Sequence, residues 1–171
     1  LAQIRARAGQ SNSSVIAYHF GSMDGLIRAV VDDRQGRLDA ERAAMIESLR
    51  TSGDPVEPRS AVWVVVRPIA ETVRAGRPYA AFLARLSEQP DVRNQYWPST
   101  GPGSGGAADV EALLTECVPH LPAQVRRSRI FQMTHSVLNL LGEHARTGRN
   151  LSEVRLLSYV DGWVGMLTAP M

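Results

Sequence analysis

The stretch AGQSNSSVIAYHFGSMDGL, residues 8–26, decides how this chain is interpreted. Gly9 suits the position after a helix end, where a positive φ is needed, and the polar residues 11–13 are of N-cap type. Ile16 and Phe20 are four residues apart, so they share a helical face that can pack on a preceding helix. Gly21 and the residue after it then end this helix and cap the next one. Two short helices joined by a tight turn form a helix-turn-helix, whose second helix enters the DNA major groove.

The residues of this stretch also resemble, in register, the DNA-binding segment of TetR-type bacterial transcriptional regulators. The matching residues are Arg7-Ala8-Gly9, Tyr18-His19-Phe20-Gly21-Ser22, Gly25-Leu26 and Ala29-Val30. The resemblance covers residues 1–31, and the remainder is similar only in being helical and of suitable length. It implies a helix-turn-helix DNA-binding domain at residues 1–31, followed by a helical effector-binding and dimerisation domain at residues 32–171. Residues 2–8 are expected to be the end of a first helix whose beginning is missing from the chain.

Short polar and methyl-bearing side chains near the start of a recognition helix can reach base edges, whereas donors at its end bind phosphates. We therefore expect DNA contacts from Asn12, Ser13, Ser14, Val15, Ala17, Tyr18, His19, Ser22 and Met23. In the alternative interpretation the serines only cap a helix and Tyr18 packs, and in both Ile16 and Phe20 belong to the core.

Two departures from the family pattern affect the predicted DNA contacts. The turn is one residue longer than in many relatives, and Ala17 and Met23 stand where many relatives have an aromatic residue and a lysine. Without that lysine, the backbone N–H groups at residues 22–24 would have to bind the phosphate. Asp24 suits the helix dipole but repels DNA. We therefore expect modest affinity for each half-site.

Composition narrows the class of protein further. The net charge of +2 does not by itself indicate a nucleic-acid partner, although residues 1–23 contain two arginines and no acid. The chain has one cysteine, Cys117, so an internal disulfide is excluded and a cytoplasmic setting is expected. No apolar run approaches the ~20 residues of a transmembrane helix, so no membrane association is predicted.

Apolar residues recur at helical spacing along the rest of the chain, and no strand-like alternation is present, so the sequence predicts an all-α fold. Helices are expected over residues 23–49, 59–75, 79–89, 109–118, 123–146 and 152–167, with another turn or two at 92–97. Pro68 is expected to kink its helix, and the composition of residues 98–106 predicts a flexible linker. The polar residues of the first long helix are expected to be solvated: Asp32, Asp33, Arg34, Arg37, Asp39, Glu41 and Arg42.

The last two helices carry apolar stripes wider than one core needs. In the family that the chain resembles, these helices pair across a two-fold axis as a four-helix bundle, so the resemblance implies a homodimer. The candidate interface residues are Val137, Leu141, Leu157, Val160, Trp163, Val164 and Leu167. Gly162 and Gly165 would permit close approach of helices. The alternative is that all seven face the chain's own core.

A pocket for a small-molecule effector is implied by the resemblance and by a set of aromatic, adaptable and polar residues on the middle helices. Its candidate lining residues are Trp63, Arg67, Phe82, Tyr96, Trp97, Phe131, Met133 and His135. The alternative for each of them is an ordinary place in the core.

No catalytic or cofactor-binding pattern is present in the sequence. The four histidines show no metal-ligand spacing with Cys117 or a carboxylate, and Gly103–Gly106 lacks the Lys-Ser/Thr of a phosphate loop. Cys117 is interpreted as an inert buried thiol rather than a nucleophile. We therefore predict no enzyme, metal or cofactor, but a homodimeric, effector-responsive regulator, in the simplest case a repressor, that binds palindromic operator DNA. The alternatives are a helical module that binds a small molecule or a protein without binding DNA, and a small helical enzyme.

Overall fold

The computed structural model describes residues 18–88 and 105–170. Helical residues 18–20 precede α3 (Met23–Thr51), α4 (Pro58–Arg74), α5 (Tyr79–Ser87), α7 (Ala107–Glu116), α8 (Ala123–Thr147) and α9 (Glu153–Thr168). Every regular element in these ranges is a helix, which confirms the all-α prediction for the described residues, and the bounds lie within about two residues of those predicted. The predicted helix end at 2–8 and the turn at 92–97 lie outside them.

The central helix is α4, which packs against α3, α5, α7, α8 and α9. Its valines have a high β propensity, but neighbours on several sides bury them and tertiary packing decides the conformation. The helix also continues through the buried Pro68, although proline removes one backbone hydrogen bond. The buried residues of this helix are Ala61, Val62, Val64, Val65, Val66, Pro68, Ile69, Ala70 and Val73.

The two C-terminal helices complete the bundle around α4. In α8, Gly142 approaches α5 so closely that a Cβ atom added there would lie 2.5 Å from the Cβ atom of Ala84. In α9, the indole of the buried Trp163 donates a hydrogen bond to the Ser136 hydroxyl across 2.9 Å. Gly148, with a φ of 66°, ends α8 in the left-handed conformation that glycine adopts at low cost. None of the helices in the described ranges has the length and apolar character needed to cross a membrane.

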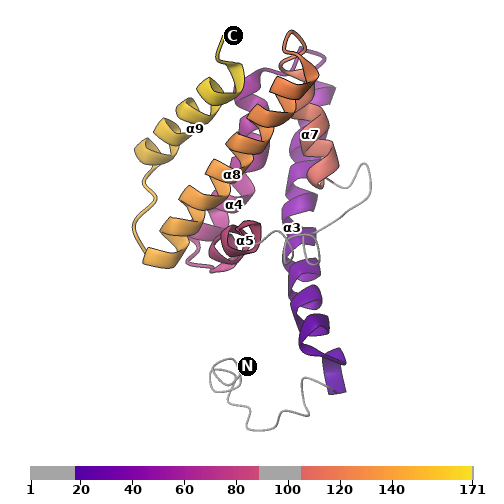
Figure 1. Ribbon diagram of the computed structural model, residues 1–171, viewed down its shortest axis with the longest axis vertical. Helices are drawn as coiled ribbons and strands as arrows, with labels where there is room; N and C mark the ends of the chain where they lie inside the picture. The colour runs from indigo at the N-terminus through magenta and orange to yellow at the C-terminus, as the bar shows by residue number, and fades with distance from the viewer. Residues whose placement is uncertain (1–17, 89–104, 171) are drawn as a thin grey trace.

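The chain falls into two regions that differ in burial. In the N-terminal arm, defined as residues 18–30, none of residues 18–22 and 24–30 is buried, whereas Val31 and several later residues of α3 are. The helical body is residues 31–51 of α3 together with α4, α5, α7, α8 and α9. Figure 1 shows the N-terminal part of α3 projecting beyond the other helices. Phe20, predicted to be a core residue, is 41% exposed because the described helices of the body do not reach it.

Part of the predicted solvated face of α3 is buried instead. Asp39 and Arg42 lie inside with Gln35: Asp39 Oδ1 accepts hydrogen bonds from Gln35 Nε2 at 2.7 Å and from Arg42 Nη1 at 3.1 Å. The Tyr79 hydroxyl on α5 donates to Gln35 Oε1 at 3.2 Å. Burial lowers the pKa of Arg42, and the Asp39 carboxylate opposes that shift. The expectation of a solvated face was wrong for Asp39 and Arg42, because mixed charges at helical spacing can also pair with one another in the interior.

The end of the predicted flexible linker is also packed. Gly105 and Gly106 are buried immediately before α7, and a Cβ atom at Gly105 would lie 2.0 Å from the Asp39 carbonyl oxygen on α3. Glycine is needed here for close approach of two backbones, which its composition alone does not distinguish from flexibility. The linker prediction is therefore wrong for these two residues, and residues 98–104 lie outside the described ranges.

Candidate functional site

The N-terminal arm contains the described part of the predicted DNA-contacting segment. Tyr18 is 84% exposed, its ring meets the exposed His19 ring edge-on at 5.0 Å, and no described residue hydrogen-bonds to either side chain. Residues 12–17 lie outside the described ranges, so the contacts predicted there remain predictions. The phenol and imidazole of the arm therefore present donors outward from the end of a helix.

A turn of fixed geometry connects these donors to α3. Gly21 has a φ of 70°, and the Ser22 hydroxyl caps α3 by accepting a hydrogen bond from the Gly25 N–H at 3.0 Å. A Cβ atom at Gly25 would lie 1.9 Å from the Phe20 carbonyl oxygen, so only glycine fits. The predicted end of one helix and cap of the next at residues 21–22 are thus confirmed.

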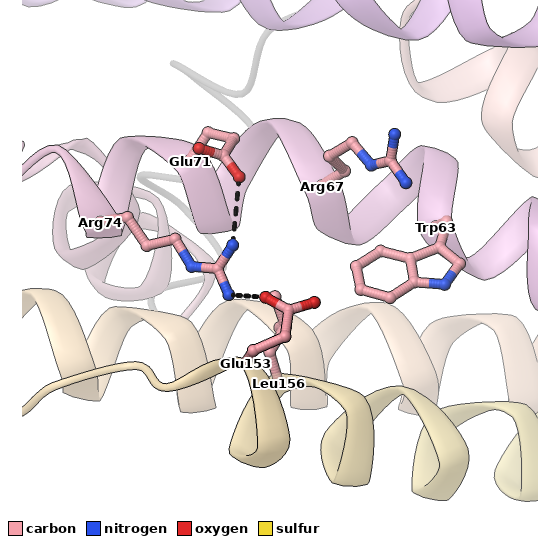
Figure 2. A pocket seen from close by; sticks show the side chains of 6 residues that line it. All are labelled: Trp63, Arg67, Glu71, Arg74, Glu153 and Leu156. Atoms are coloured by element: carbon pink, nitrogen blue, oxygen red, sulfur yellow. Dashed lines mark hydrogen bonds and ion pairs between the residues drawn. The ribbon is translucent and has the colours of Figure 1, made fainter.

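The second candidate site is a pocket of about 260 Å³ between α4 and α9. It is lined by Trp63, Arg67, Glu71, Arg74, Glu153 and Leu156. Figure 2 shows Arg67 and Trp63 beside each other, and Glu71, Arg74 and Glu153 linked at the other side of the view. Two of the predicted lining residues, Trp63 and Arg67, therefore come together.

Charge is distributed unevenly along this pocket. Arg74 donates to Glu153 at 2.5 Å and to Glu71 at 3.4 Å. The hydrogen bond to Glu153 raises the pKa of Arg74 above its ordinary value. The Arg67 guanidinium instead lies 5.5 Å from the centroid of the Trp63 ring, and none of the described carboxylates pairs with it. The two glutamates thus share one arginine, and a second arginine stands against an aromatic face.

Sequence reasoning missed four of the six lining residues. Trp63, Arg67, Glu71 and Arg74 follow one another at spacings of four, four and three, which places them on one face of α4. That pattern could have identified Glu71 and Arg74. Glu153 and Leu156 come from a helix about eighty positions later, and no local pattern relates them to α4.

The other predicted pocket residues do not line this cavity. Met133 is completely buried in the core, Phe82 is half-buried and stacks on Tyr79 at 5.9 Å, and Phe131 is 53% exposed with its ring 4.0 Å from that of His135. Phe82, Phe131, Met133 and His135 are therefore not part of the cavity between α4 and α9, and aromatic residues at helical spacing also serve as core or surface. Tyr96 and Trp97 lie outside the described residues.

Most of the predicted dimer contacts belong to the chain's own core. Five of the seven candidates are buried between α9, α8 and α4: Val137, Leu141, Val160, Trp163 and Leu167. They cannot meet a second copy without opening that core, so the interface prediction is corrected for them. Leu157 is exposed on α9, whereas Val164 is half-buried and packs against the same core. A Cβ atom at Gly162 or Gly165 would meet nothing within 4 Å, so none of the described helices approaches them closely.

The described residues offer no group of three or more metal-binding side chains. The Cys117 thiol donates to the Val56 and Leu113 carbonyl oxygens at 3.3 Å, and burial raises its pKa to about 11. A thiol with such a pKa stays protonated near neutral pH and is a poor nucleophile.

Comparisons with known proteins identified no relative of this chain. No family model matches the chain, and no significantly similar curated protein or solved structure was found.

Proposed function

We propose that this protein is an effector-responsive DNA-binding regulator, a repressor of the TetR type that its sequence resembles, acting as a homodimer on palindromic operator DNA. The observation that carries the proposal is the exposed Tyr18–His19 pair at a helix end, joined through Gly21 and the Ser22 cap to α3. A hydroxyl and an imidazole N–H in this position can donate to phosphate oxygens and orient the preceding helix.

The electrostatics of the arm also support DNA as the partner. Residues 18–23 carry no acidic side chain, and the first turn of α3 has N–H groups and a positive dipole end that favour an anion. Asp24 in the same turn weakens this attraction. A half-site should therefore bind with modest affinity, and two half-sites held by one dimer should bind much better.

A surface suited to dimer formation remains on α8 and α9 after the five core residues are excluded from the predicted interface. The large hydrophobic residues exposed there include Leu140, Val154, Leu157 and Met166, and Val154 is 79% exposed. The open Gly162 and Gly165 lie on the same helix as three of them. A two-fold interface places the same patch of each copy against the other, so this revised set replaces the core residues as the proposed dimer contact.

DNA binding is tested by selecting fragments from a random-sequence library and measuring their affinity by fluorescence anisotropy at moderate salt. A palindromic fragment should bind better than a scrambled one. Tyr18→Phe and His19→Ala should each weaken binding by about fivefold, because each removes one phosphate contact. His135→Ala, on α8 in the body, is the matched control and should bind as the native chain does. Equal affinity for palindromic and scrambled DNA would contradict the proposal.

The dimer is tested by light scattering coupled to gel filtration. Leu157→Arg should shift the molar mass from dimer to monomer, because a charge buried in an apolar interface is strongly unfavourable. Gln132→Arg, an exposed polar position on α8, is the control that should remain dimeric. A native chain that runs as a monomer at micromolar concentration would rule the homodimer out.

A further inference from the structure

The pocket between α4 and α9 has the chemistry of an anion site with an aromatic wall. Its one arginine without a carboxylate partner among the described residues is Arg67, whose guanidinium lies over Trp63. A guanidinium presents parallel N–H donors that match the two oxygens of a carboxylate. Figure 2 shows Arg67 and Trp63 on α4, with Leu156 of α9 across the cavity.

The other charges of the pocket limit which anion can enter. Glu71 and Glu153 both pair with Arg74, so these three side chains carry one net negative charge beside Arg67. A doubly charged phosphate would be repelled by this group, whereas a single carboxylate on Arg67 meets less repulsion. The volume of about 260 Å³ lies just below the range of typical ligand pockets. It therefore suits a molecule with about one ring.

We propose that this pocket binds a small aromatic carboxylate, with the carboxylate paired to Arg67 and the ring against Trp63 and Leu156. Binding needs only these residues, but its role as the effector site rests on the proposed function. Such a role is possible because α4 packs against both α9 and α3, and α3 leads to the N-terminal arm. A ligand in this pocket therefore contacts α4, and α4 in turn packs against α3.

The test is calorimetric titration of the full chain, without DNA, with benzoate as the probe. One saturable site is expected with a dissociation constant on the order of 1 mM, since a ligand this small gains limited binding energy. Benzamide, which has the same shape without the charge, and inorganic phosphate should both bind at least about tenfold more weakly.

Substitutions then locate the site. Arg67→Gln should weaken benzoate binding by about tenfold, and Arg67→Lys by less, because lysine keeps the charge and loses the paired donors. Glu71→Gln should strengthen it by about twofold, since one repelling charge is removed. Arg77→Gln, at an exposed arginine in the turn after α4, is the control for charge and should have no effect. Circular dichroism establishes that each variant is folded.

Three results would overturn the inference: no saturable benzoate binding by the folded native chain, equal binding of benzamide, or equal loss in the Arg67→Gln and Arg77→Gln variants. The two proposals fail separately. Arg67-dependent benzoate binding by a chain that does not select DNA would contradict the proposed regulator function and support the carboxylate site. Palindrome-selective DNA binding by a chain that does not bind benzoate would support the regulator function and contradict the carboxylate site.

Discussion

The N-terminal arm and the helical body are built from the same kind of sequence but use it differently. In the body, apolar residues at helical spacing are buried against several neighbours, as Val64 and Leu141 are. In the arm, Phe20 and Val30 follow similar spacing and remain more than one-third exposed. The difference teaches that an apolar stripe predicts a surface that needs a partner, and does not say whether that partner is in the same chain.

The largest expected effect is the difference in stability between two variants, each with one aromatic side chain truncated to alanine, one in the body and one in the arm. Trp163→Ala should lower the free energy of unfolding by about 3–5 kcal/mol, because it empties a fully packed site and leaves the Ser136 hydroxyl without its indole donor. Phe20→Ala should cost less than about 1 kcal/mol, since the ring is already partly in water. Urea denaturation of both variants measures the contrast. Similar losses would mean that the arm is as tightly packed as the body.

Adding a single methyl group should produce the next largest effect. Gly142→Ala places a Cβ atom 2.5 Å from the Cβ atom of Ala84 and 3.1 Å from the Ala80 carbonyl oxygen. We expect a loss of about 1–3 kcal/mol, because α8 and α5 must move apart. The thermal midpoint of unfolding records this loss, and an unchanged midpoint would show that the two helices are not in close contact.

The smallest expected effect is a gain in α3, the helix that runs through both regions. Gly36 lies in the middle of α3 with nothing within 4 Å of an added Cβ atom, so Gly36→Ala should stabilise the chain by about 0.5–1 kcal/mol. Gly162→Ala in α9 is equally open within one chain and serves as the matched comparison. A gain at Gly36 with a loss at Gly162, seen in unfolding experiments at high protein concentration, would indicate that a second copy packs on α9.

Sequence reasoning predicted the helices well because their signal is local. Apolar periodicity identifies each helix, and capping residues mark its ends, as Ser22 does at the start of α3 and Gly148 at the end of α8. Whether a polar residue is buried depends on distant partners, so the hydrogen bond from Tyr79 to Gln35 could not be foreseen across 44 positions. The packing of Gly105 against α3 could not be predicted either, because the composition around Gly105 is typical of flexible linkers.

The candidate pocket was predictable in part for the same reason. The face of α4 that contains Trp63, Arg67, Glu71 and Arg74 follows from helical spacing. The partner helix does not, because the ion pair between Arg74 and Glu153 joins residues 79 positions apart. The dimer candidate Leu157 illustrates the limit again, because it is exposed while its neighbour in sequence, Leu156, is buried.

The buried group Gln35–Asp39–Arg42, tied to α5 through Tyr79, gives α3 a fulcrum. The helix is uninterrupted over 29 residues, and at about 1.5 Å per residue the lever from Asp39 to Ser22 is about 25 Å long. A tilt of about 10° at the fulcrum would swing its tip by about 4 Å, which exceeds the reach of a hydrogen bond. In the DNA complex proposed above, a small rearrangement of the bundle around Tyr79 would therefore be enough to move the Tyr18 hydroxyl onto or off a phosphate.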